Sequence, residues 1–188
     1  MALVAEFTFA ETGITVPYEP CFEGIRANSG FTDLRGHPEL VAGIPEAQRS
    51  RALSTFLHQI AVDEDWISLG CDLGHHIVTE EGRHLYLAGG YVQFTFDDFF
   101  KGYDFYQRLA EGLYNDLFES AAANDWRISF QIGDVRYKLE REETDIASLY
   151  VWFDAAAATL SDAEAARERL IDALRISLLE PVLAPLDS

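Results

Sequence analysis

Basic side chains, lysine above all, are scarce in this sequence. Lys101 and Lys138 are the two lysines, and 14 lysines and arginines stand against 32 aspartates and glutamates, which gives a net charge of −18 at pH 7. Acidic residues outnumber basic ones in each of the segments 1–45, 46–100 and 101–188. A surface this negative repels nucleic-acid phosphates and anionic lipid, so we expect no direct binding to nucleic acid or to a membrane. The acidic excess favours a basic protein partner; the alternative is that it serves solubility alone.

Cysteine is also rare, and the motifs of metal, phosphate and nucleophilic sites are absent from the sequence. Cys21 and Cys71 can form at most one bridge, which excludes a disulfide-stapled scaffold. The sequence has no Cys-x-x-Cys or His-Glu-x-x-His metal motif, no glycine-rich phosphate loop and no Gly-x-Ser-x-Gly elbow. We therefore predict no cofactor, no bound metal and no catalytic residue.

Long hydrophobic runs are missing as well. No stretch reaches the roughly 18 uninterrupted apolar residues of a membrane-spanning helix. Residues 1–6 lack the basic segment that opens a secretory signal, so a cytoplasmic location is expected. The many alanines and few lysines are typical of a GC-rich bacterial coding sequence.

The sequence is nevertheless rich in core-forming residues. Of its 188 residues 48% are hydrophobic and 13% aromatic, which fits one folded domain over 1–188. Apolar residues at helical spacing predict helices over 46–62, 99–122 and 162–180, and alternating apolar residues predict hairpins over 67–96 and 126–153.

Finer signals predict how these elements begin and bend. Asp97 or Asp98 is expected to cap the second helix, Asn124 to end it, and Ser161 with Glu164 to form a capping box for the third. The pairs Gly89-Gly90 and Gly133-Asp134 predict β-bulges, or in the first case a tight turn.

The hairpins resemble each other, which predicts two ββα-like units. Trp66 opens the first and Trp126 the second, and the return strands read Tyr-Val-Gln-Phe from 91 and Tyr-Val-Trp-Phe from 150. We expect an α+β fold in which an antiparallel sheet of two hairpins packs on about three helices. Strands at 2–9 and 13–18 would extend this sheet, with residues 1–45 an irregular segment before an α-ββ(β)-α-ββ-α core at 46–185. This element order resembles type III secretion chaperones.

The sheet face turned away from the helices is the predicted partner-binding surface. Strand alternation places a mixed aromatic and polar set there: Tyr91, Gln93, Arg127, Tyr150 and Trp152. Tyrosine, tryptophan and arginine are enriched at binding hot spots. The alternative is that the N-terminal segment covers these rings within the molecule, using Phe7, Phe9, Tyr18 and Phe22.

Three functions follow as hypotheses. The first is a non-catalytic, acidic protein that binds a basic partner, as immunity proteins, secretion chaperones and nuclease or defence-system inhibitors do. The second is an enzyme or small-ligand binder with a site near residues 19–45, where Cys21, Arg26, Arg35 and His37 carry the chemistry. The third is a structural subunit whose outer-face rings are buried in a homodimer.

Overall fold

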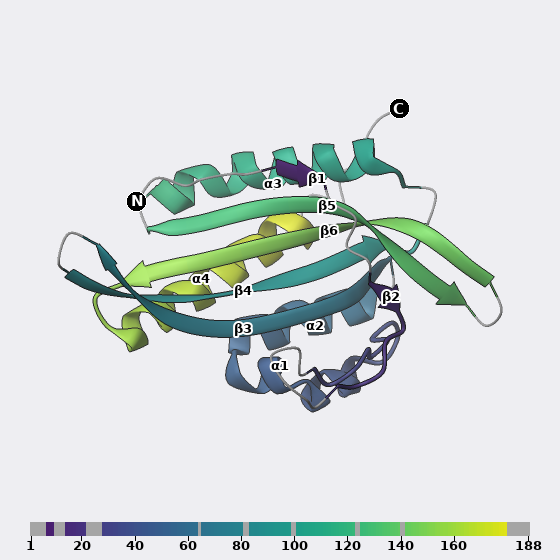
Figure 1. Ribbon diagram of the computed structural model, residues 1–188, viewed down its shortest axis with the longest axis horizontal. Helices are drawn as coiled ribbons and strands as arrows, with labels where there is room; N and C mark the ends of the chain where they lie inside the picture. The colour runs from purple at the N-terminus through teal and green to yellow at the C-terminus, as the bar shows by residue number, and fades with distance from the viewer. Residues whose placement is uncertain are drawn as a thin grey trace.

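The computed structural model is α+β and has one mixed sheet with helices on one face (Figure 1). It describes residues 7–9, 14–21, 28–63, 65–80, 83–98, 101–122, 125–139 and 142–179. The two hairpins are β3 (Trp66–Glu80) with β4 (Arg83–Phe96) and β5 (Trp126–Leu139) with β6 (Glu142–Ala157). The helices over the sheet are α2 (Arg51–Asp63), α3 (Tyr103–Ala122) and α4 (Leu160–Leu179).

The predicted N-terminal extension of the sheet is confirmed, but it makes the sheet mixed instead of antiparallel. Strands β1 (Phe7–Phe9) and β2 (Thr15–Val16) both pair in parallel with β5. The main order is β1-β5-β6-β4-β3, which leaves β3 as the edge strand on the other side.

The two ββα units meet through their return strands, β4 and β6, which pair antiparallel. Val92 pairs with Val151, while Tyr91 pairs with Trp152 and Gln93 with Tyr150. These partners occupy equivalent places in the two similar segments, so a pseudo-two-fold axis passes between Val92 and Val151.

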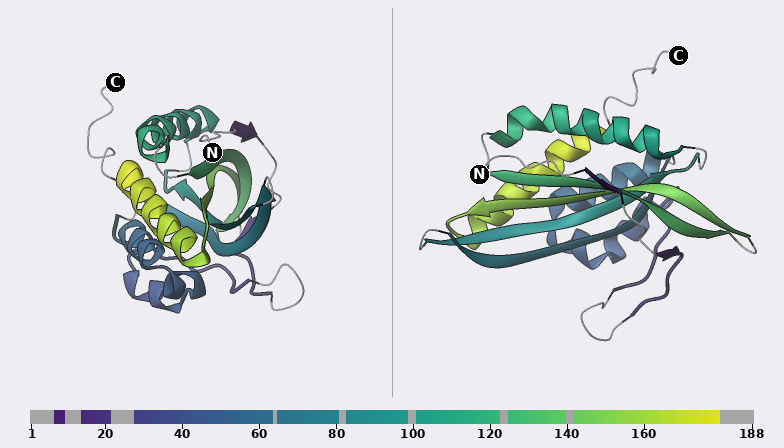
Figure 2. Two further views of the ribbon diagram at one scale, coloured as in Figure 1. Left: turned by 90° about the vertical axis from the view of Figure 1, so that its left-hand side faces the viewer. Right: turned by 45° about the horizontal axis from the view of Figure 1, so that its top comes forward.

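The main core lies between the helices and this sheet. Helix α4 crosses β4 and β6 at the centre, with α2 towards β3 and α3 towards β5 (Figure 2). Trp66 and Trp126, which open the two hairpins, are both buried in this core.

A second, smaller core lies on the opposite face of the sheet. Val135 and Tyr137 from β5 are buried there, while Ile132 of the same strand is buried in the main core. The β5–β6 register continues without a shift through Gly133. The expected bulge at Gly133-Asp134 was therefore wrong: the apolar pattern changes phase because the covered face changes.

The bulge that the sheet does contain lies in β3. The β3–β4 register shifts between Ser68 and Gly70, whereas β4 runs unbroken through Gly89-Gly90. As a result Ile67 faces the second core, whereas Leu73 faces the main one.

Helix boundaries differ from the expectation in two places. The helix predicted over 46–62 breaks at Ser50, which is extended and separates α1 (Pro45–Arg49) from α2. The Ser50 hydroxyl accepts a hydrogen bond from the Leu53 N–H at 3.0 Å and so caps α2. Before α1 lies a 3₁₀ helix, η2 (Pro38–Gly43).

The predicted N-terminal caps of the other two helices were wrong. Thr159 caps α4, because its hydroxyl accepts the Asp162 N–H at 3.2 Å and donates to the Asp162 carboxylate at 2.7 Å. Helix α3 begins at Tyr103, too far along the chain for Asp97 or Asp98 to cap it. Asn124 lies outside the described residues. No helix in the described part of the chain combines the length and apolar character needed to cross a membrane.

Candidate functional site

Three aromatic rings from the two central strands form a cluster on the face away from the helices. The ring centroids of Tyr91 and Trp152 lie 4.8 Å apart, those of Tyr91 and Tyr150 5.6 Å, and those of Tyr150 and Trp152 5.8 Å. The last pair is stacked, with an angle of 8° between the planes. Tyr150 is only 7% exposed, but Trp152 is 42% exposed, so the cluster ends in an accessible indole.

The other two residues predicted for this surface are placed differently. Gln93 is 3% exposed, and its amide donates to the Ser148 hydroxyl at 3.1 Å, which in turn donates to the Gly133 carbonyl. Gln93 thus holds the sheet together beneath the rings and does not reach a partner. Arg127 is exposed on β5, paired with Asp154 of β6.

The N-terminal segment covers part of this face. The Tyr18 hydroxyl donates to the Leu69 carbonyl at 3.2 Å, and the Tyr18 ring packs edge-on against Phe31 at 6.2 Å. Both rings flank the second core and leave Trp152 exposed. Phe7 and Phe9 instead belong to β1 at the sheet edge, and Phe22 lies outside the described residues.

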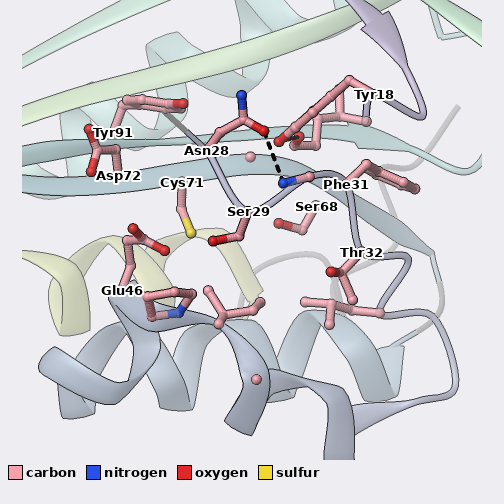
Figure 3. A pocket seen from close by; sticks show the side chains of 17 residues that line it. Tyr18, Asn28, Ser29, Phe31, Thr32, Glu46, Ser68, Cys71, Asp72 and Tyr91 are labelled. Carbon is pink, nitrogen blue, oxygen red and sulfur yellow. Dashed lines mark hydrogen bonds between the residues drawn. The ribbon is translucent and has the colours of Figure 1, made fainter. Parts of the chain in front are cut away.

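A pocket of about 380 Å³ opens between this segment and the edge of β3 (Figure 3). Its walls come from residues 28–32, from residues 43–46 at the start of α1, and from residues 68–72 of β3. Tyr91 also lines it, so the pocket and the aromatic cluster share a side chain. Gly70 contributes no side chain, which leaves space between Tyr18 and Tyr91.

Backbone hydrogen bonds hold the outer wall of the pocket. The amides and carbonyls of Cys21 and Asn28 exchange two hydrogen bonds, and the Phe31 N–H donates to the Tyr18 carbonyl at 2.9 Å. Gly30 has a φ of 82° and donates its N–H to the Asn28 side chain at 2.9 Å. A left-handed residue is needed at this bend, which is why glycine occupies it.

The residues expected to carry chemistry near 19–45 do not line this pocket. Arg35 binds Asp33 at 2.6 Å, Asp97 at 2.5 Å and the Tyr137 hydroxyl at 3.1 Å, so it fastens the segment to the ends of β4 and β5. His37 contacts Glu39, Cys21 is exposed, and Arg26 lies outside the described residues.

The lining is acidic and contains no lysine or arginine among its seventeen residues. Glu46 rises from α1 and Asp72 comes from β3 (Figure 3). Glu46 is 20% exposed and has one long contact, 3.4 Å, with the exposed Arg49, which points outside the lining set. The Asp72 carboxylate accepts the Leu73 N–H at 2.7 Å. The pocket therefore presents negative charge to any group that binds in it.

The titratable groups with shifted pKa values around the site are all held in the neutral form. Burial raises the pKa of the Cys71 thiol to about 12, with Glu46 adding to the shift, and burial raises the pKa of Tyr18 and Tyr91 as well. The thiolate, not the thiol, is the nucleophile. Cys71 is accordingly a protonated wall residue at neutral pH and not an activated nucleophile.

These shifts predict alkaline destabilisation. Tyr150 ionises near 10.0 when unfolded, but burial raises its pKa to about 12 in the fold, so stability present below pH 10 is lost as pH rises towards 12. Tyr150→Phe removes this contribution. The free energy of unfolding, measured in urea between pH 8 and 11.5, should fall above pH 10 in both proteins. We expect it to fall less steeply in the variant than in the wild type, by up to about 1.4 kcal/mol per pH unit. Parallel curves for the two proteins would contradict the buried, neutral phenol.

Metal chemistry finds no geometric support in the described residues. No three histidine, cysteine, aspartate or glutamate side chains converge there as a metal site requires. Comparison of the chain with protein-family models, with curated protein sequences and with solved structures gives no match in any of the three. The function is therefore inferred from the pocket and the rings alone.

Proposed function

We propose that this protein binds a basic partner protein without catalysing a reaction, through Trp152 and the neighbouring acid-lined pocket. The observation that carries the proposal is the composition of that pocket: two carboxylates and aromatic walls, with no lysine or arginine among the described residues that line it. The exposed indole would supply binding energy at the interface, and the neighbouring acidic pocket would select a basic side chain of the partner.

The whole-chain charge supports the same proposal. A net charge of −18 accelerates encounter with a cationic protein, while desolvated rings supply the affinity that holds the complex. Immunity proteins, secretion chaperones and inhibitors of nucleases or defence systems share this physical profile, and the proposed setting is the cytoplasm. Tyr91 and Tyr150 hold Trp152 in place, so little side-chain entropy is lost on binding.

A second candidate is a binder of a small cationic ligand. The pocket lies between residues 28–46 and the sheet, and its volume falls within the range of small-molecule sites, roughly 300–1,000 Å³. The protonated Cys71 thiol argues against covalent catalysis there. The exposed Trp152 favours the protein partner, because a small ligand in the pocket would not need it.

The test is selection from a displayed random-peptide library, counter-selected on a Trp152→Ala variant. We expect the retained peptides to be rich in arginine, lysine and aromatic residues, and to lose at least about tenfold in affinity on Trp152→Ala. Phe118→Ala is the matched control, because Phe118 is similarly exposed, at 47%, but lies on α3.

Three outcomes would overturn the proposal. Neutral or acidic peptides would exclude a basic partner. Equal losses of peptide affinity in Trp152→Ala and Phe118→Ala would exclude the surface around Trp152 as the binding site. Light scattering could show a stable dimer that the Trp152→Ala substitution dissociates, and the rings would then belong to a homodimer interface.

A further inference from the structure

We propose that the pocket at the β3 edge receives the side chain of an arginine from the partner, an inference that rests on the proposed function. Among the residues that the structure describes, this pocket combines a cavity with two acidic side chains and aromatic walls.

The electrostatics of the cavity favour a cation. The negative charge of Glu46 raises the pKa values of Tyr18 and Cys71, and that of Asp72 raises the pKa of Tyr91, so both carboxylates act on the groups that line the pocket. Burial is the largest cause of the shift in all three groups, so these groups lie in surroundings less polar than bulk water. Coulomb attraction to an entering cation is stronger there than in bulk water.

The shape of the lining favours a planar cation over a compact one. Aromatic rings line the pocket from both sides, Tyr91 from the sheet and Tyr18 and Phe31 from the N-terminal segment, and the two carboxylates come from α1 and β3 (Figure 3). A guanidinium stacks on aromatic faces and directs five N–H donors around its rim. An ammonium has three donors and no flat face, so it cannot use both kinds of wall equally well.

Neutral acceptors complete the set that a guanidinium needs. The hydroxyl-bearing residues Ser29, Thr32 and Ser68 also line the cavity, on the side away from the two carboxylates (Figure 3). The volume of about 380 Å³ holds one long side chain with its flanking backbone and not a folded element. The site is thus a socket for one residue, next to the Trp152 anchor.

The probe is the capped tripeptide acetyl-Gly-Arg-Gly-amide, titrated while amide shifts of the protein are followed by NMR. We expect saturable shifts confined to the pocket residues 28–32 and 68–72. The lysine tripeptide should bind at least about fivefold more weakly, and the citrulline tripeptide, neutral but of the same shape, should not saturate.

Charge-neutral variants locate the site. Glu46→Gln should weaken the arginine tripeptide by about tenfold or more, as expected for a partly buried charge-assisted contact, and Asp72→Asn should weaken it less because Asp72 is exposed. Asp116→Asn is the matched control: it removes the same charge from an exposed site on α3 and should change the affinity less than twofold. Gly70→Val fills the space between Tyr18 and Tyr91 without changing charge, and should also weaken binding.

The outcomes separate this inference from the proposed function. Equal binding of arginine and lysine tripeptides, or equal losses for Glu46→Gln and Asp116→Asn, would overturn the arginine socket but leave a basic partner standing. Saturable binding of the neutral citrulline tripeptide would overturn the proposed arginine site. The pocket would then no longer support a cationic partner. If no tripeptide binds while library peptides still depend on Trp152, the socket fails and the proposed function survives.

Discussion

Gly90→Ala should lower the free energy of unfolding by about 3 kcal/mol, which corresponds to a fall in melting temperature of about 6–12 °C. A Cβ at this position overlaps the Asp72 carbonyl oxygen and comes within 3.0 Å of the Leu73 side chain. The first clash is with backbone of the paired strand, which cannot move without distorting the β3–β4 ladder. Gly90 is required here for close approach of the strands.

Gly74→Ala is the matched control. Gly74 lies on β3, paired with Gly89, and a Cβ built there meets no atom within 4 Å. Both substitutions add one methyl group and restrict the unfolded chain equally, so their difference isolates the clash in the fold. Thermal unfolding followed by circular dichroism measures both. We expect Gly74→Ala to stay within about 0.5 kcal/mol of the wild type, and a comparable loss in the two variants would disprove the close approach.

Trp66→Ala should cost about 3–5 kcal/mol of unfolding free energy. The side chain is fully buried and packs edge-on against Phe94 at 5.3 Å and Phe96 at 4.7 Å between centroids. Its removal leaves a large cavity where α2 meets the first hairpin. Trp152→Ala removes an equally large side chain from a partly exposed site and should cost at most about 1.5 kcal/mol, the contribution of its ring contacts.

Urea unfolding followed by far-ultraviolet circular dichroism measures this pair without relying on tryptophan fluorescence. The contrast bears on function, because it shows whether Trp152 can be removed for binding experiments without unfolding the protein. A loss at Trp152 as large as at Trp66 would mean that the exposed indole is a structural residue, and the proposed partner surface would lose its anchor.

Most of the fold follows from local pattern. The hairpins opened by Trp66 and Trp126, and the helices after them, were predicted from periodicity and are present. The cap of α4 was not predicted correctly. Thr159-x-x-Asp162 and Ser161-x-x-Glu164 overlap in the sequence, and both satisfy the chemistry of a capping box. Only the packing of α4 on the sheet selects the first. The pair Gly89-Gly90 was expected to mark a bulge or a tight turn, and this was wrong: β4 runs unbroken through it, and glycine is needed at 90 because the backbone of β3 lies close.

The candidate site was predictable only in part. Strand alternation identified Tyr91, Tyr150 and Trp152 as a group, because both return strands carry the same sequence pattern. Burial of Gln93 depends on Ser148, a neighbour across the sheet that no local pattern marks. The pocket brings together segments 28–34, 43–46 and 68–72, which lack a shared motif. A site formed by distant segments with ordinary residues leaves no trace in periodicity or spacing.

The pseudo-two-fold axis between Val92 and Val151 has a consequence for how a partner docks. A face built from two equivalent halves would accept the same partner in two orientations, half a turn apart. The N-terminal segment removes that degeneracy, because Ile67 and Val135 are covered on its side while their counterparts in the other half, Arg127 and His76, are exposed. If the proposed partner binds this face, the covered half of the face would therefore fix a single orientation for it within one chain.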